Sequence, residues 1–171
     1  MASYKIICPE FGWPAVTDTG TFATSLGIQP PLQLGQLVSA VDLTYGVGEF
    51  VFAYGSNVSA GNLVQFTGSN YGVRAYGSAT ASIGPVGYAA AAMSATNVWG
   101  FVQVRGIFDS ATADAAIALG VAFKAGGAVG RVASRNATNV TNQIYGMYNA
   151  SSNSASTGCS IMLDYPYYLG Y

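Results

Sequence analysis

The clearest strand pattern in the chain is WGFVQVRG, at residues 99–106. Successive side chains of a strand point to opposite faces of a sheet, so Trp99 and Phe101 would share one face and Val102 and Val104 the other. An alternation of this kind is typical of β-structure. It predicts a strand in the middle part of the chain.

Short runs with a similar β-like pattern, separated by glycine, lie on both sides of this segment. In Glu49–Tyr54 the rings of Phe50, Phe52 and Tyr54 would share one face. Further strand candidates are 62–66, 71–76, 87–93, 144–148, and the two arms of a hairpin around Gly126-Gly127, at 121–124 and 128–133. Together they predict an all-β fold: a small β-sandwich or β-barrel with an extended N-terminal arm and little helix.

Two alanine-rich segments are the places where a helix is conceivable. Thr112–Gly120 is the best helix candidate, although it is too short to be stable alone. Gly87–Met93 fits either a strand or a short helix.

Changes in composition divide the chain into three expected parts. Residues 1–35 form an extended N-terminal arm, because the prolines among them exclude a helix of useful length. Residues 36–135 form a β-rich core domain, and residues 136–171 form a C-terminal loop and a tyrosine-rich tail. The aromatic residues of the arm indicate that it packs on its own domain or on a neighbour.

Charged residues are few, with six Lys or Arg, seven Asp or Glu and no histidine among 171 residues. An ordinary domain carries roughly three times that share. A compact monomer of this mass exposes about 8,000 Å², so much of its surface must be uncharged. Such surfaces are covered by partners or prone to stick, and we therefore expect a subunit of an assembly.

The same composition argues against several other classes of protein. The net charge of −1 and the scattered basic residues give no electrostatic footprint for nucleic acid. No sustained block of Leu, Ile or Val predicts a membrane span, and the first residues lack the apolar core of a secretory signal.

Patterns for catalysis are weak. Without histidine there is no Ser-His or Cys-His nucleophile and no His-based metal site, and we expect no cofactor. Asp42 and Glu49 are the nearest candidates for a glycosidase pair, although an edge charge and a turn residue explain them more simply. Asp109 and Asp114 suit turn or N-cap roles. We expect that the chain is not an enzyme.

The two cysteines, Cys8 and Cys159, lie near opposite ends of the chain. Nothing in their spacing brings their Cβ atoms together. The simpler interpretation is two reduced, partly buried residues that behave as small hydrophobes.

Aromatic residues gather near both ends of the chain. Tyrosine supplies a broad, rigid contact area with a polar tip, which suits interfaces. The C-terminal tyrosines would either line a seam between subunits or belong to a terminal strand packed on its own domain, and the same alternatives hold for the arm. The residues expected to contact a partner or a neighbouring subunit are Phe11, Trp13, Phe22, Leu32, Leu34, Tyr165, Tyr167, Tyr168 and Tyr171.

A family resemblance covers residues 30–133. The segment PPLQLGQ at 30–36 precedes VDLTYGVGEFVF at 41–52, in which an aspartate is followed by a GVGEF strand. Matching turn-and-strand patterns continue at 61–64, 84–93, 99–106 and 130–132. In these motifs the chain resembles small structural proteins of tailed phages, and its layout is similar to that of phage head decoration, or capsid cement, proteins.

The resemblance implies a virion structural protein on the outer surface of the capsid, made in the host cytoplasm. Such a protein would bind the major capsid protein and stabilise the shell, as a homotrimer by family analogy. A second hypothesis is a tail-fibre or knob domain that binds host-surface carbohydrate, because a composition rich in Gly, Ser, Asn and Tyr suits it equally well. A third is a hydrolase that uses two of the carboxylates.

Overall fold

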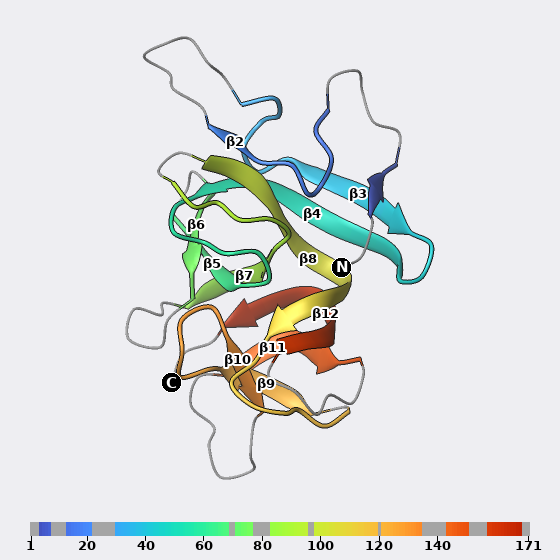
Figure 1. Cartoon of the computed structure of the whole chain (residues 1–171), viewed down its shortest axis with the longest axis vertical. Coiled ribbons are helices and arrows are strands. Elements are labelled where there is room, and N and C mark those ends of the chain that lie inside the picture. Colours follow the sequence, from blue (N-terminus) through green and yellow to red (C-terminus); the bar gives the residue numbers. More distant parts are fainter. Residues whose placement is uncertain are drawn as a thin grey trace.

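The computed structural model of the chain describes residues 4–7, 13–21, 30–68, 71–76, 83–95, 98–119, 121–134, 143–150 and 157–168. These residues form an all-β fold, and no helix occurs among them (Figure 1). The strands are β1 (Lys5–Ile6), β2 (Gly20–Thr21), β3 (Leu37–Asp42), β4 (Gly46–Gly55), β5 (Leu63–Thr67), β6 (Gly72–Ala75), β7 (Gly84–Ala89), β8 (Val98–Thr112), β9 (Ala122–Ala125), β10 (Val132–Ser134), β11 (Gln143–Asn149) and β12 (Thr157–Tyr168).

The strands join in one mixed sheet of 12 strands, in the order β1-β3-β4-β6-β5-β7-β8-β12-β11-β9-β10, with β2 paired to β8. Strand β4 also pairs with β8, so β4, β6, β5, β7 and β8 return on themselves as a ring. The β4–β6 contact is parallel, and the other contacts of the ring are antiparallel. The predicted all-β class, with a barrel-like arrangement, is confirmed.

Strand β8 connects the upper and lower parts of the molecule in Figure 1. Its first half pairs with β4, from Val98 to Arg105, and its second half pairs with β12, from Arg105 to Thr112. Gly106 lies at the change of partner, with a φ of 90°. A Cβ there would stand 2.6 Å from the Val47 carbonyl oxygen, so this position requires glycine.

Three clusters of buried side chains fill the fold. The first, which we call the N-side core, consists of Tyr4, Val16, Leu32, Val38, Ala40, Phe50, Phe52, Ala90 and Phe101. The second, the C-side core, contains Leu63, Tyr76, Val86, Tyr88, Phe108, Ala111, Ala113, Ile117, Phe123, Ala125, Val132, Ile144, Met147, Cys159, Ile161, Leu163 and Tyr168. The third belongs mainly to the strands of the ring and consists of Ala53, Val58, Val64, Val73, Ala89, Met93, Val98, Val102 and Val104.

Most of the strands expected from the sequence are confirmed, including the segment at 99–106 and the hairpin formed by β9 and β10. The helix expected at Thr112–Gly120 is wrong over its described residues. Thr112 ends β8, and Ala113 forms a parallel bridge to Val132. The Thr112 hydroxyl donates to the carbonyl oxygens of Gly61, at 3.2 Å, and Gly130, at 3.0 Å. These long-range pairings override the helix propensity of the alanine-rich segment.

The expected division into three parts stays a prediction. Within the described residues, however, strands from all three parts belong to the same sheet. In the described part of the chain, there is no helix long and apolar enough to span a membrane.

Candidate docking surface

The described arm residues that were expected at an interface pack against their own chain. Leu32 is buried in the N-side core, and Trp13 and Leu34 are half-buried against it. Tyr4 anchors the beginning of the arm to β8, because its hydroxyl donates to the Ile107 carbonyl oxygen at 2.6 Å. Of the two alternatives for the arm, the structure favours packing on its own domain. Phe11 and Phe22 lie outside the described residues.

The C-terminal tyrosines divide into buried and exposed positions. Tyr168 is buried in the C-side core, and its ring meets the Tyr76 ring edge-on, with centroids 5.0 Å apart. Tyr165 and Tyr167 remain exposed on β12. Tyr171 lies outside the described residues. The tail therefore contains a strand of the sheet, and two of its tyrosines still face solvent.

A surface that was not expected from the sequence lies on the hairpin of β3 and β4. We call it the hairpin patch, and it consists of Leu37, Val41, Leu43 and Val47, all exposed. Val41 and Val47 are directly paired across the two strands. The signal in the sequence is that β3 carries apolar residues on both faces, since Val38 and Ala40 point into the N-side core.

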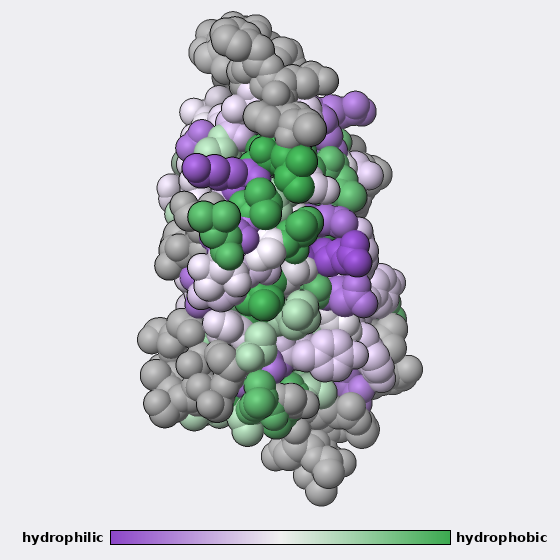
Figure 2. All heavy atoms as spheres, turned by 90° about the vertical axis from the view of Figure 1, so that its right-hand side faces the viewer, coloured by the Kyte–Doolittle hydropathy of each residue, from purple (hydrophilic) through white to green (hydrophobic). Residues whose placement is uncertain are grey.

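The tip of this hairpin is held by Asp42. Its Oδ1 atom accepts hydrogen bonds from the backbone amides of Thr44, at 2.7 Å, and Tyr45, at 3.0 Å. This Asx-type turn fixes the backbone around Leu43, which is fully exposed. Figure 2 shows one side of the molecule, on which hydrophobic residues form a band along the long axis between more hydrophilic areas.

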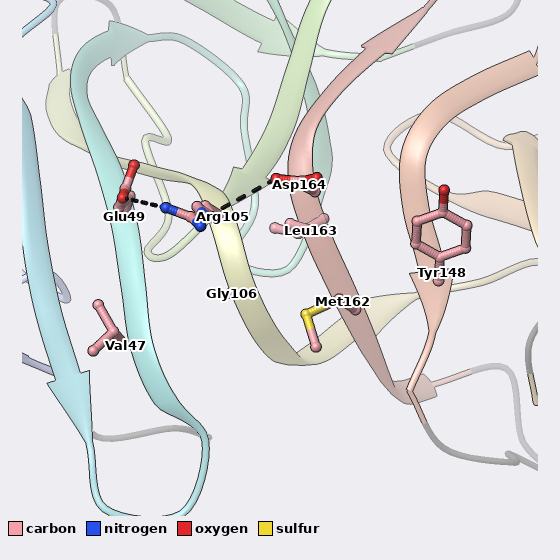
Figure 3. Close-up of a pocket in the computed structure, with 8 residues that line it drawn as sticks. All are labelled: Val47, Glu49, Arg105, Gly106, Tyr148, Met162, Leu163 and Asp164. Carbon is pink, nitrogen blue, oxygen red and sulfur yellow. Dashed lines mark hydrogen bonds and ion pairs between the residues drawn. The ribbon is translucent and has the colours of Figure 1, made fainter.

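An open groove begins next to the patch and crosses β4, β8, β12 and β11 (Figure 3). It has a volume of about 490 Å³ and is lined by Val47, Glu49, Arg105, Gly106, Tyr148, Met162, Leu163 and Asp164. Gly106 has no side chain, while its neighbours Val47 and Met162 project on either side. The lining of the groove therefore includes the glycine at which β8 changes partner.

One end of the groove carries three charged side chains. A nitrogen of the Arg105 guanidinium lies 3.0 Å from a Glu49 carboxylate oxygen, and its Nε lies 3.9 Å from Asp164. The Tyr165 hydroxyl donates to the other Glu49 oxygen, and its ring lies 5.9 Å from the guanidinium carbon. The hydrogen bond to Glu49 raises the pKa of Arg105 and also that of Tyr165. Arg105 therefore stays charged, and Tyr165 stays a neutral donor, at ordinary pH.

A second, more apolar hollow of about 340 Å³ is lined in part by Tyr165, whose hydroxyl reaches Glu49 of the groove. It is lined by Val51, Phe66, Gly68, Tyr71, Pro85, Val104 and Tyr165. This face thus combines an apolar patch, a groove with a charged end and an apolar hollow, which is the mixture found at protein interfaces.

The carboxylates singled out for chemistry have structural partners instead. Asp42 caps the hairpin turn, whereas Glu49 pairs with Arg105, and the two stand at separate places on the hairpin. Asp109 accepts a hydrogen bond from the Ser110 hydroxyl at 2.9 Å, and Asp114 accepts one from the Gly127 amide. The contacts of Asp42 and Glu49 match the turn and edge-charge interpretations. The turn or N-cap role expected for Asp109 is wrong, because Asp109 lies within β8, and no helix that Asp114 could cap occurs among the described residues.

Metal-binding and cysteine chemistry give no additional site. Within the described ranges, no group of three or more Cys, Asp or Glu side chains is placed to hold a metal ion. Cys159 is buried in the C-side core with a free thiol, whereas Cys8 lies outside the described residues.

The comparisons with known proteins leave the family open. No protein-family model matches this chain, and the search of curated proteins gives no significant match.

Proposed function

We propose that the chain is a virion structural protein that decorates a phage capsid and stabilises it by binding the major capsid protein. The observation that carries this proposal is the hairpin patch, in which apolar side chains point outward from a hairpin fixed by its own core and turn. The resemblance of residues 30–133 to phage head decoration proteins supports the same function. The protein would act on the outer surface of the virion, without catalysis or a cofactor.

The hairpin patch is suited to docking because its backbone is already fixed, so little conformational entropy is lost on binding. Burying about 400 Å² of apolar surface yields roughly 10 kcal/mol before entropic costs are subtracted. These costs are smaller for side chains on a paired hairpin than for a free arm. We therefore assign docking to the hairpin rather than to Trp13, Leu32 and Leu34, which pack on the N-side core.

Many weak contacts would act together on a shell. Repeated copies and self-association, proposed here as a homotrimer by family analogy, multiply the effect of each docking event. The molecule exposes 8238 Å², and the whole sequence contains only seven acidic and six basic residues. A surface with so few charges makes contacts that salt weakens little.

A pelleting assay with purified empty heads tests the proposal. The double substitution Leu37→Ser with Leu43→Ser removes two apolar side chains from the patch, and we expect about a hundredfold weaker binding. The matched control is Leu119→Ser with Val129→Ser, which changes two apolar residues that are also exposed but lie outside the patch. Equal binding by the patch variant and the wild type would refute docking through the hairpin.

Salt provides a second test of the same proposal. If docking is apolar, raising the salt to about 1 M should leave the protein on the particles. Release in moderate salt would mean that charge pairs hold it.

A tail-fibre or knob domain is the second candidate, and the exposed tyrosines beside the polar groove favour it. The number of copies per purified particle separates the two functions. Hundreds of copies fit head decoration, and a few or a few dozen fit a tail.

A further inference from the structure

We propose that the groove between β4, β12 and β11 binds a neutral sugar ring, as part of an oligosaccharide. This binding site goes beyond shell docking and would serve the second candidate function. Because Val47 belongs to both the groove and the hairpin patch, the site is tested on the free chain, without heads. The groove's volume of about 490 Å³ falls within the usual range for small-molecule sites. It is open along its length, which suits a chain-like ligand better than an enclosed cofactor.

The charged end of the groove presents a donor and an acceptor next to each other. The Arg105 side chain is 54% exposed and the Asp164 side chain 71% exposed, and their contact is long, at 3.9 Å. Both groups therefore keep hydrogen-bonding capacity toward the groove. Two neighbouring hydroxyls of a sugar match this pair, because one can accept from the guanidinium while the other donates to the carboxylate.

The remaining part of the groove offers contacts for the apolar face of a sugar. Val47, Met162 and the ring of Tyr148 line it, and each is at least 41% exposed. Aromatic and aliphatic side chains next to a few fixed polar groups are the usual composition of a small-molecule site. Figure 3 shows Tyr148 on β11, next to β12, which carries Asp164, whereas Arg105 and Glu49 lie farther away on β8 and β4.

The local charge selects among sugars. Glu49 and Asp164 are two carboxylates, and Arg105 is the one guanidinium among the residues that line the groove, which leaves a net charge of −1. Anionic ligands such as uronic acids, sialic acids and phosphates are repelled by this charge. Neutral sugars and their N-acetyl derivatives are not.

An extended peptide is a poorer match for the same groove. Glu49 pairs with Arg105, and Gly106 pairs with Leu163, so the backbones of β4, β8 and β12 are already paired with one another there. A peptide could not add to the sheet at this place as a further strand, which is the usual way in which sheets bind extended peptides.

Saturation-transfer NMR on the full chain tests the inference with defined probes. The neutral set consists of the methyl glycosides of glucose, galactose, mannose and N-acetylglucosamine, and the acidic set of glucuronic acid and N-acetylneuraminic acid. We expect saturation transfer to at least one neutral probe, and about tenfold weaker binding of the acidic probes.

Two tyrosines of β11 provide a matched pair of variants. Tyr148→Ala removes an exposed ring that lines the groove, and we expect about tenfold weaker binding of the neutral probe. Tyr145→Ala removes a similarly exposed ring that does not line it, and binding should stay within about twofold. Asp164→Ala should weaken binding about tenfold, because a sugar hydroxyl loses its acceptor.

Three results would overturn the inference: no transfer to any neutral probe, binding only of the acidic set, or equal binding by Tyr148→Ala and the wild type. Because each variant alters an exposed side chain, circular dichroism can confirm that the fold is retained before binding is compared.

Discussion

The two ends of the chain are both rich in aromatic residues, but they differ in the length of their strands and in the position of these strands in the sheet. At the N-terminal end, β1 and β2 are two residues long, and β1 lies at the edge of the sheet. At the C-terminal end, β12 is 12 residues long and lies between β8 and β11. Each end also places one tyrosine in a core: Tyr4 on the N-side and Tyr168 on the C-side.

The comparison teaches that aromatic content alone does not show how an end of a chain is used. A strand paired on both sides is part of the fold, because its loss leaves two neighbours with unpaired backbone groups. Loss of a two-residue edge strand exposes backbone groups of only one neighbouring strand, and water can hydrogen-bond to them. The N-terminal segment is thus a cover on the sheet, and the C-terminal strand is a component of it.

Truncation should give the largest difference between the two ends. Removing residues 151–171 deletes β12, and we expect loss of cooperative thermal unfolding, measured by circular dichroism. Removing residues 1–29 deletes β1 and β2 and uncovers the N-side core, and this protein should stay folded with a melting temperature lower by about 10 °C. A folded protein without β12 would contradict the distinction.

Single substitutions at the two anchoring tyrosines sharpen the comparison. Tyr168→Ala should cost about 4 kcal/mol of unfolding free energy, because a cavity forms between fixed strands next to Tyr76. Tyr4→Ala should cost about 2 kcal/mol, since a short edge segment can relax around the gap. Urea denaturation measures both values, and equal costs would mean that the N-terminal segment is held as firmly as β12.

Glycine substitutions test how tightly each end approaches its neighbour. Gly146→Ala should cost about 2 kcal/mol, because the residue has a φ of 71° and its Cβ would clash with the Asp164 carbonyl oxygen. Gly20→Ala would instead meet the Trp99 ring, at 2.6 Å, and a partly exposed ring can shift. Its cost should stay below about 1 kcal/mol. A larger loss of stability in Gly20→Ala than in Gly146→Ala would show that the contact of β2 with β8 is the more rigid one.

The smallest expected difference concerns alkaline pH. Burial raises the pKa of Tyr76, the ring partner of Tyr168, far above its ordinary value, and it also raises that of Tyr4. The folded state then holds protons that the unfolded state releases. This contribution to stability is fully present below about pH 10 and is lost as the pH rises further. Tyr76→Phe should flatten this decline more than Tyr4→Phe, and an unchanged decline in both variants would exclude these groups as its cause.

Much of the fold could be predicted from local patterns, but the site could not. The alternation in Glu49–Tyr54 and at 99–106 identified two central strands because both faces of each are constrained by packing. Thr112–Gly120 is not the expected helix because Thr112 and Ala113 pair with residues that are distant in the sequence, which no local pattern contains. The charged end of the groove joins Glu49 to Arg105, which are 56 residues apart, and no local pattern contains that register.

The hairpin patch could be predicted from the sequence only in part. Its signal, apolar residues on both faces of β3, was present in the sequence. Without the structure, however, the inward pair Val38 and Ala40 could not be told from the outward pair Leu37 and Val41. The exposed face of β3 can be identified only after the N-terminal segment has been placed against its other face.

Cryo-electron microscopy of intact particles that carry this chain tests most directly whether its sparsely charged exterior serves to bind a shell. We predict many copies on the head, each with Leu37, Val41, Leu43 and Val47 in contact with the major capsid protein. Heads that lack the chain, or copies whose β3–β4 hairpin faces solvent, would contradict this account.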